Sequence, residues 1–158
     1  MLRSAMRDDK GTAVARPRRL ALLLLKMEIW VTARLLPFAV AFRDLSQILR
    51  LGDVKSSSLY EGTAPETIAH ATHRATRKPW LMRNRRCLRQ GLIGYRFLRK
   101  AGHEPELHFG IDVGSMERDK IDAHCWVVLD SKPVVNDILE GMVTVHVHTS
   151  MSTGPAKS

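Results

Sequence analysis

The chain has 158 residues, 44% of them hydrophobic and 6% aromatic, with two cysteines and a formal net charge of +9 at pH 7. This size suits one domain with an aliphatic core, and the cysteines are too few for a disulfide scaffold. The charge attracts polyanions, acidic peptides or anionic membranes, and it does not choose among them.

The first patterned segment follows a polar stretch, residues 1–16, which we expect to be a disordered basic tail. Apolar residues then recur at spacings of three and four: Leu20, Leu24, Met27, Val31, Leu35 and Phe38. This period predicts an amphipathic helix that packs its apolar stripe into the core, with contact to a membrane surface as the alternative. Pro37 should end or kink the helix, and a second short helix should cover residues 42–51.

Neither a secretory signal nor a membrane span is expected in this segment. Residues 20–25 are apolar, but charges at Lys26, Glu28 and Arg34 interrupt the continuation, and no small-residue cleavage site is evident. A span would need about 20 nearly uncharged residues. We therefore expect a cytoplasmic protein.

Two further helices should follow a loop at residues 52–63. The third helix should begin with Thr63 as its N-cap and Pro65 in its first turn, and end near residue 77. The fourth should follow Cys87 and end at a left-handed cap on Gly102. Gly91 and Gly94 lie inside this fourth helix, which indicates close packing on a strand or another helix.

After residue 102 the apolar period changes to two, which is typical of strands. We expect four of them: residues 106–113, 123–129, a third within 130–137 and a fourth at 144–149. Helices followed by an antiparallel sheet make an α+β fold. We divide the chain accordingly into a helical N-terminal region (17–78) and a core (79–150), with a second disordered tail at 151–158.

Cys87 stands where the fourth helix should begin, among Arg83, Arg85, Arg86 and Arg89. A helix N-terminus and neighbouring cations both favour the thiolate over the thiol, and so lower the thiol pKa. Because the thiolate is the nucleophilic form, Cys87 is our candidate nucleophile, and its backbone N–H should be one oxyanion donor. A second donor is not identified; Trp80 and Asn84 are near in sequence. The simpler alternative is a buried or passive thiol.

His124 opens the second predicted strand and is the candidate base for Cys87. If residues 130–131 form a two-residue turn, Leu129 pairs with Lys132, and counting back places His124 opposite Asp137. The Asp137 carboxylate would then fix the imidazole tautomer. A structural histidine and a strand-end aspartate are the simpler alternatives.

A register slip of one residue would put Asn136 or Ile138 opposite the histidine, and Asn136 could still orient an imidazole. Cys125 follows His124 directly, so its side chain should point to the other face of the sheet as a small core residue.

No metal or cofactor is expected. Cys87, His124 and Cys125 lack the paired spacing of zinc sites. His146 and His148 share a strand face, but no acidic or thiol pair accompanies them.

Five motifs together resemble one family. They are Pro79-Trp80, Cys87-Leu88, residues 95–102, residues 107–110 and the run Ala123-His124-Cys125-Trp126-Val127. In these motifs the chain is similar to the lasso peptide biosynthesis B2 proteins over about residues 20–150, and its C-terminal half is the specific part.

The resemblance implies a cysteine peptidase of transglutaminase-like, papain-like fold that removes the leader from a ribosomally made precursor peptide. It implies Cys87 as nucleophile and His124 as base. The family's acid stands about twelve residues after the histidine, where this chain has Asn136, and we assign the role to the adjacent Asp137. The implied partners are the precursor, a separate small leader-recognition protein and an ATP-dependent lasso cyclase.

Two other functions fit parts of the sequence. The charge alone suggests a nucleic-acid-binding or non-catalytic interaction module, but few aromatic residues and no helix-turn-helix or ribonucleoprotein pattern accompany it, so we expect no nucleic-acid partner. A different transglutaminase-like activity, amide crosslinking, would be distinguished by release of ammonia.

Overall fold

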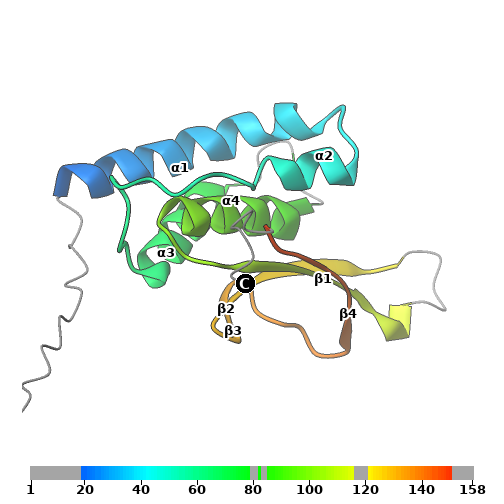
Figure 1. The fold of residues 1–158 in the computed structure, drawn as a ribbon. Helices are drawn as coiled ribbons and strands as arrows, with labels where there is room; N and C mark the ends of the chain where they lie inside the picture. The colour runs from blue at the N-terminus through cyan, green and yellow to red at the C-terminus, as the bar shows by residue number, and fades with distance from the viewer. Residues whose placement is uncertain (1–18, 79–81, 83–84, 116–120, 151–158) are drawn as a thin grey trace, which may run out of the picture.

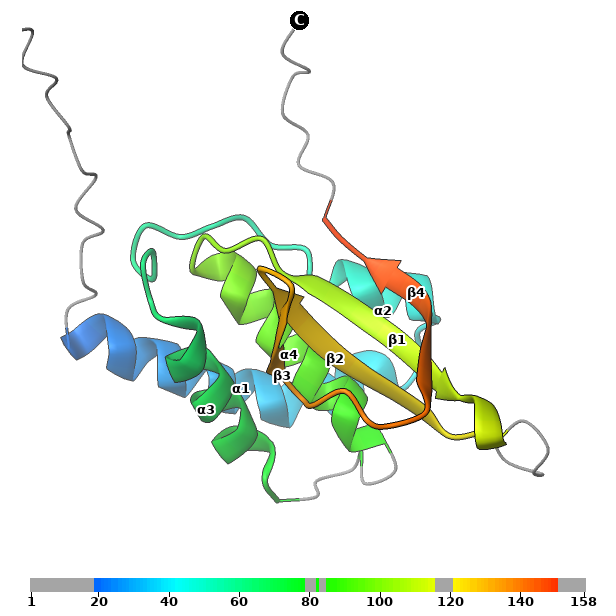
Figure 2. The ribbon, with the colours of Figure 1, turned by 90° about the horizontal axis from the view of Figure 1, so that it is seen from below.

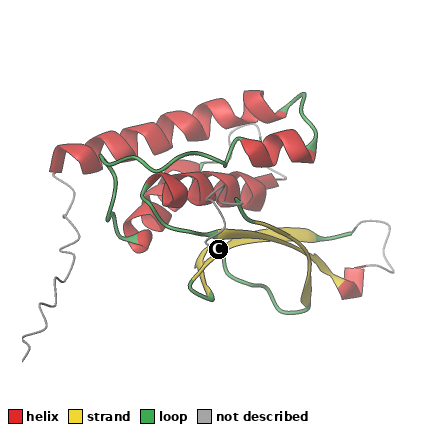
Figure 3. Cartoon of the chain, viewed as in Figure 1, coloured by secondary structure: helices red, strands yellow, loops and turns green. Residues whose placement is uncertain are grey.

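The computed structural model describes residues 19–78, 82, 85–115 and 121–150. Its helices are α1 (Arg19–Val40), α2 (Leu45–Arg50), α3 (Pro65–Thr76) and α4 (Arg86–Lys100). The strands that follow are β1 (Glu106–Asp112), β2 (Ala123–Leu129), β3 (Lys132–Val135) and β4 (Met142–His148). A short 3-10 helix, η2 (Val113–Ser115), follows β1. The strands form one antiparallel sheet in the order β3-β2-β1-β4. Figure 3 shows the helices gathered on one side of this sheet, so the predicted α+β fold is confirmed. The two expected tails lie outside the described residues, and the division at residue 78 stays a prediction.

Helix α4 lies between the other helices and the sheet. In Figure 1, α1 and α2 form the outermost layer, α4 lies beneath them and the sheet follows. Figure 2 shows β1 and β2 crossing α4, with α3 next to the β3 edge. Buried residues of α4 such as Ile93 and Leu98 join those of α1 and the sheet in one aliphatic core. The start of α4 is thereby held against the sheet.

Helix α1 buries a different face from the one its apolar period predicted. The buried side chains recur mostly every four residues: Ala21, Leu25, Ile29, Ala33, Leu36 and Val40. Most of the predicted stripe points outward instead, including Met27, Leu35 and Phe38. The helix is apolar on both faces, and the small Ala21 and Ala33 let its backbone approach the underlying helices closely. In the part of the chain described here, no helix has the length and apolar character to cross a membrane.

The cation Arg89 is buried between α4 and α1. Pro37 lies inside α1, which ends three residues later, and it has no N–H to donate to the carbonyl of Ala33 one turn back. The Arg89 Nε donates to this carbonyl at 3.0 Å, and its Nη1 donates to the Lys78 carbonyl at 3.4 Å. Arg89 therefore joins α4 to α1 and to the end of α3. The prediction that Arg89 acts on the Cys87 thiol is therefore wrong.

The ends of α3 and α4 confirm the positions predicted for Pro65 and Gly102 and correct the predicted N-cap of α3. Pro65 is the first residue of α3, but the N-cap is Ala64 rather than Thr63. The Thr63 hydroxyl is buried and donates to the Tyr60 carbonyl at 2.7 Å, and α3 has no side-chain cap at its start. Gly102 after α4 has φ +87°, the expected left-handed conformation.

Gly91 and Gly94 are the points where α4 touches the sheet, as their position predicted. A Cβ on Gly91 would lie 3.0 Å from the Cys125 Sγ, and one on Gly94 would lie 2.6 Å from a methyl carbon of Val135. Glycine therefore allows the backbone of α4 to approach β2 and β3 more closely than any other residue would.

Replacing Gly94 by alanine is expected to lower the free energy of unfolding by about 2 kcal/mol, although alanine is the better helix former. Val135 is buried and branched at Cβ, so it has no room to move away from the added methyl group. Urea unfolding measures the change. Gly94→Ala combined with Val135→Ala should lose less stability than the sum of the single changes, whereas strict additivity would show that the two positions do not touch.

Candidate active site

Cys87 is the second residue of α4, as its sequence context predicted, and its side chain is half-buried. One turn further along the same helix face, Gly91 lies against the Cys125 Sγ on β2. The face that carries Cys87 is therefore pressed onto the sheet at Cys125. The two cysteines come from different elements and are unpaired.

Cys125 is a direct partner of the Cys87 thiol and not only a core residue. Its side chain and its backbone N–H both hydrogen-bond to the Cys87 sulfur. Hydrogen bonding from Cys125 is the largest influence on the pKa of Cys87, which falls to about 5 despite the opposing effect of burial. The pKa of Cys125 is raised, first because of the same hydrogen bond and then by burial. At neutral pH Cys87 is thus the thiolate, and Cys125 remains a protonated donor.

His124 lowers the pKa of Cys87 further, through its charge and a side-chain hydrogen bond. The ring is half-buried at the start of β2 and stacks on Trp126, with the ring centroids 6.1 Å apart. Its Nε2 lies 3.0 Å from the main-chain carbonyl oxygen of Asp137. A carbonyl only accepts, so Nε2 must carry the hydrogen, and in the neutral ring Nδ1 has the free lone pair.

The predicted pairing of His124 with Asp137 is wrong because the hairpin contains a bulge. Residues 130 and 131 both have positive φ and form the expected two-residue turn, and Leu129 pairs with Lys132. The register then shifts by one residue after Pro133, so that Val127 faces Val135, where β3 ends. Pro133 lies in an edge strand next to this bulge, which is where proline is tolerated in a sheet.

The structure joins His124 by a hydrogen bond to the main chain of Asp137 and not to its carboxylate. The carboxylate is exposed, and its charge acts on His73 of α3, whose pKa is lowered chiefly by burial against the opposing effect of this carboxylate. The contact with His124 comes from the main chain of Asp137. A carbonyl dipole orients the imidazole but stabilises its charged form less than a carboxylate would.

Asn136 ties the two cysteine segments together. Its side-chain Nδ2 donates to the carbonyl of Cys87 at 3.1 Å and to the carbonyl of Cys125 at 2.8 Å. Asn136 has φ +60°, a left-handed conformation that asparagine tolerates better than most residues. The sequence suggested this residue as an alternative orienter of His124. In the structure it instead clamps the start of α4 to β2.

Replacing Asn136 by glycine is expected to lower the free energy of unfolding by about 1–2 kcal/mol and to slow alkylation of Cys87 at neutral pH. Glycine keeps the left-handed backbone but removes the amide that holds the two cysteine segments together. Asp130→Gly is a matched control, because Asp130 also has positive φ (49°) but lies in the turn, and it should change neither property. Equal behaviour of the two variants would contradict the clamp.

The described cations near Cys87 in the sequence, Arg85, Arg86 and Arg89, are not among the groups that lower its pKa. Arg85 and Arg86 are exposed, and Arg89 is bound to α1. Among the described residues, those that lower the Cys87 pKa are Cys125 and His124. Trp80, Arg83 and Asn84 lie outside the described residues.

A search of the described residues found no group of three or more histidine, cysteine, aspartate or glutamate side chains that could hold a metal ion. The His148 Nε2 hydrogen-bonds to the Asp53 carboxylate at 3.0 Å. The centroid of the His146 ring lies 5.9 Å from that of the Phe109 ring.

The comparisons with known proteins agree with this geometry at the level of the family. The family model described as the transglutaminase-like superfamily matches residues 32–147, well over half of the chain. Neither the curated proteins nor the solved structures gave a match.

Proposed function

The chain belongs to the transglutaminase-like superfamily, and on this premise we propose that it is a cysteine peptidase that removes the leader from a ribosomally made lasso precursor peptide. The superfamily includes cysteine peptidases. The observation that carries the proposal is the position of Cys87 at the start of α4, packed against β2, where Cys125 and His124 lower the pKa of its thiol to about 5. The lasso substrate is suggested by the motifs around these two residues.

The reaction divides into two steps. The Cys87 thiolate attacks the carbonyl carbon at the junction of leader and core, and the oxyanion that forms is stabilised by the backbone N–H of Cys87 in the first helical turn. The imidazolium of His124 gives its Nδ1 proton to the leaving nitrogen, the C–N bond breaks, and the core departs with a free α-amine. Water, deprotonated by His124, then attacks the thioester; the C–S bond breaks, the leader leaves as its carboxylic acid, which ionises, and the Cys87 thiolate and the His124 imidazolium are restored.

The partners follow from the same proposal. A separate leader-recognition protein presents the precursor, and a lasso cyclase joins the freed α-amine to an acidic side chain of the core in the cytoplasm. Arg85 and Arg86 are exposed beside Cys87 and would suit an acidic stretch of the leader.

Mass spectrometry of the precursor tests the proposal. The full-length protein is incubated with a lasso precursor in the presence and in the absence of its leader-recognition protein. We expect separate leader and core masses, with an added water, and faster release when the recognition protein is present. An intact precursor with all partners present would contradict the proposal. Loss of ammonia from a glutamine-containing substrate would instead indicate the crosslinking activity.

A further inference from the structure

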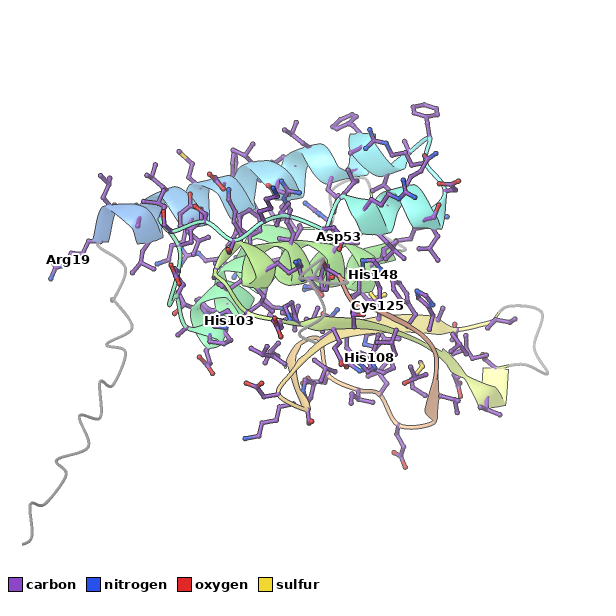
Figure 4. All side chains as sticks on the ribbon, in the orientation of Figure 1. Arg19, Asp53, His103, His108, Cys125 and His148 are labelled. Atoms are coloured by element: carbon purple, nitrogen blue, oxygen red, sulfur yellow. The ribbon has the colours of Figure 1, made fainter. Side chains whose placement is uncertain are left out.

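Helix α1 presents a large apolar surface to solvent. Seven of its bulky apolar side chains are at least 40% exposed: Leu20, Leu23, Met27, Trp30, Val31, Leu35 and Phe38. We call these seven residues the outer face. Figure 4 shows side chains standing out from the side of α1 that is turned away from α4, and Phe42, just beyond the helix, is 96% exposed.

The outer face is an exposed apolar strip along most of the length of α1. It follows a helix of 22 residues, so it extends over roughly 30 Å. Contiguous apolar patches of this kind usually mark an interaction site. The opposite side of α1 is buried in the core, so the helix can contact an apolar phase only along this one side.

The charges around the outer face are almost all positive. Lys26 and Arg43 are exposed, and the Arg34 guanidinium lies over the Trp30 ring, 4.7 Å from its centroid. Glu28 is the one acid in α1, and it forms an ion pair with Lys100 of α4. Asp44, just beyond α1, is a second acid near this face and is exposed. An apolar strip bordered mainly by cations is complementary to a surface that is apolar inside and anionic at its edge.

We infer that the outer face of α1 lies on the surface of an anionic membrane. The apolar side chains enter the boundary between headgroups and acyl chains, and the cations contact the lipid phosphates. A bilayer surface offers both contacts to a convex helix, whereas a protein partner would need a matching groove about 30 Å long with an acidic rim. The candidate site stays accessible, because Cys125 lies in the sheet layer, on the other side of α4 from α1 (Figure 4).

Co-sedimentation of the full-length protein with vesicles tests this inference. We expect binding to vesicles of phosphatidylcholine mixed with phosphatidylglycerol, much weaker binding to phosphatidylcholine alone, and release at high salt. Met27→Glu with Phe38→Glu should weaken binding at least about tenfold, because each change puts a charge into the apolar strip. Both positions are exposed, so the fold should survive, which circular dichroism checks.

The matched control is Val143→Glu with Val145→Glu, two exposed apolar residues of β4, which should bind as the unaltered protein does. Equal loss in both double variants, or no vesicle binding by the unaltered protein, would overturn the inference. So would a dimer, or a complex with the leader-recognition protein, that forms without lipid and is lost only in the α1 variant. Leader cleavage is measured separately and does not affect this conclusion.

Discussion

Cys87→Ala is expected to slow leader cleavage by roughly 10⁴-fold or more, to the level of the uncatalysed mixture. The thiolate forms the covalent intermediate, and the adjacent Cys125 is protonated and buried, so it offers no replacement. His124→Ala should slow cleavage by roughly 10²–10⁴-fold, because it removes the proton donor for the leaving amine. Initial rates of leader release, followed by mass spectrometry, measure both effects.

The control for these variants is His103→Ala, which removes the same type of side chain just beyond the C-terminal end of α4, whereas Cys87 lies at its start. It should cleave at the unaltered rate. Cys125→Ser is informative in a different way, because its hydroxyl keeps a donor beside the thiolate and should preserve much of the activity. Cleavage by Cys87→Ala at the unaltered rate would remove this residue from the reaction.

Arg89→Met is expected to lower the free energy of unfolding by about 3 kcal/mol, a large part of the stability of a domain this size. Methionine fills a similar volume but leaves the carbonyls of Ala33 and Lys78 without the Arg89 donors. Pro37 has no N–H to take over the bond to Ala33. Urea unfolding measures the loss.

The matched control for Arg89 is Arg86→Met, since Arg86 is an exposed arginine in the same helix and should change stability by less than about 0.5 kcal/mol. Similar values for the two variants would show that the buried guanidinium does not hold α1 in place.

Much of the fold was predictable from local pattern. The change of apolar period after Gly102 marked the strands, and the glycines of α4 marked its contact with the sheet. Which face of α1 is buried was not predictable, because both faces carry apolar residues at helical spacing. The buried face is the one that carries the small Ala21 and Ala33.

The candidate site was predictable in its first two members and not in its third. A cysteine at a helix start and a histidine opening a strand are local features. The relation of His124 to Asp137 depends on one bulged residue after Pro133, and a shift of one residue in a strand exchanges the two faces. The bond from Asn136 to both cysteine carbonyls is a tertiary contact, and the only sequence signal for it is an asparagine just after a short strand.

The pH dependence of Cys87 alkylation tests most directly whether this site holds a thiolate. Iodoacetamide reacts with the thiolate form, and peptide mapping separates Cys87 from the buried Cys125. With a pKa of about 5, the rate should rise through pH 5 and be nearly constant at neutral pH, and His124→Ala should move the midpoint upward. A midpoint near that of an ordinary thiol, about 8.5, would show that Cys87 is not activated and would contradict the account.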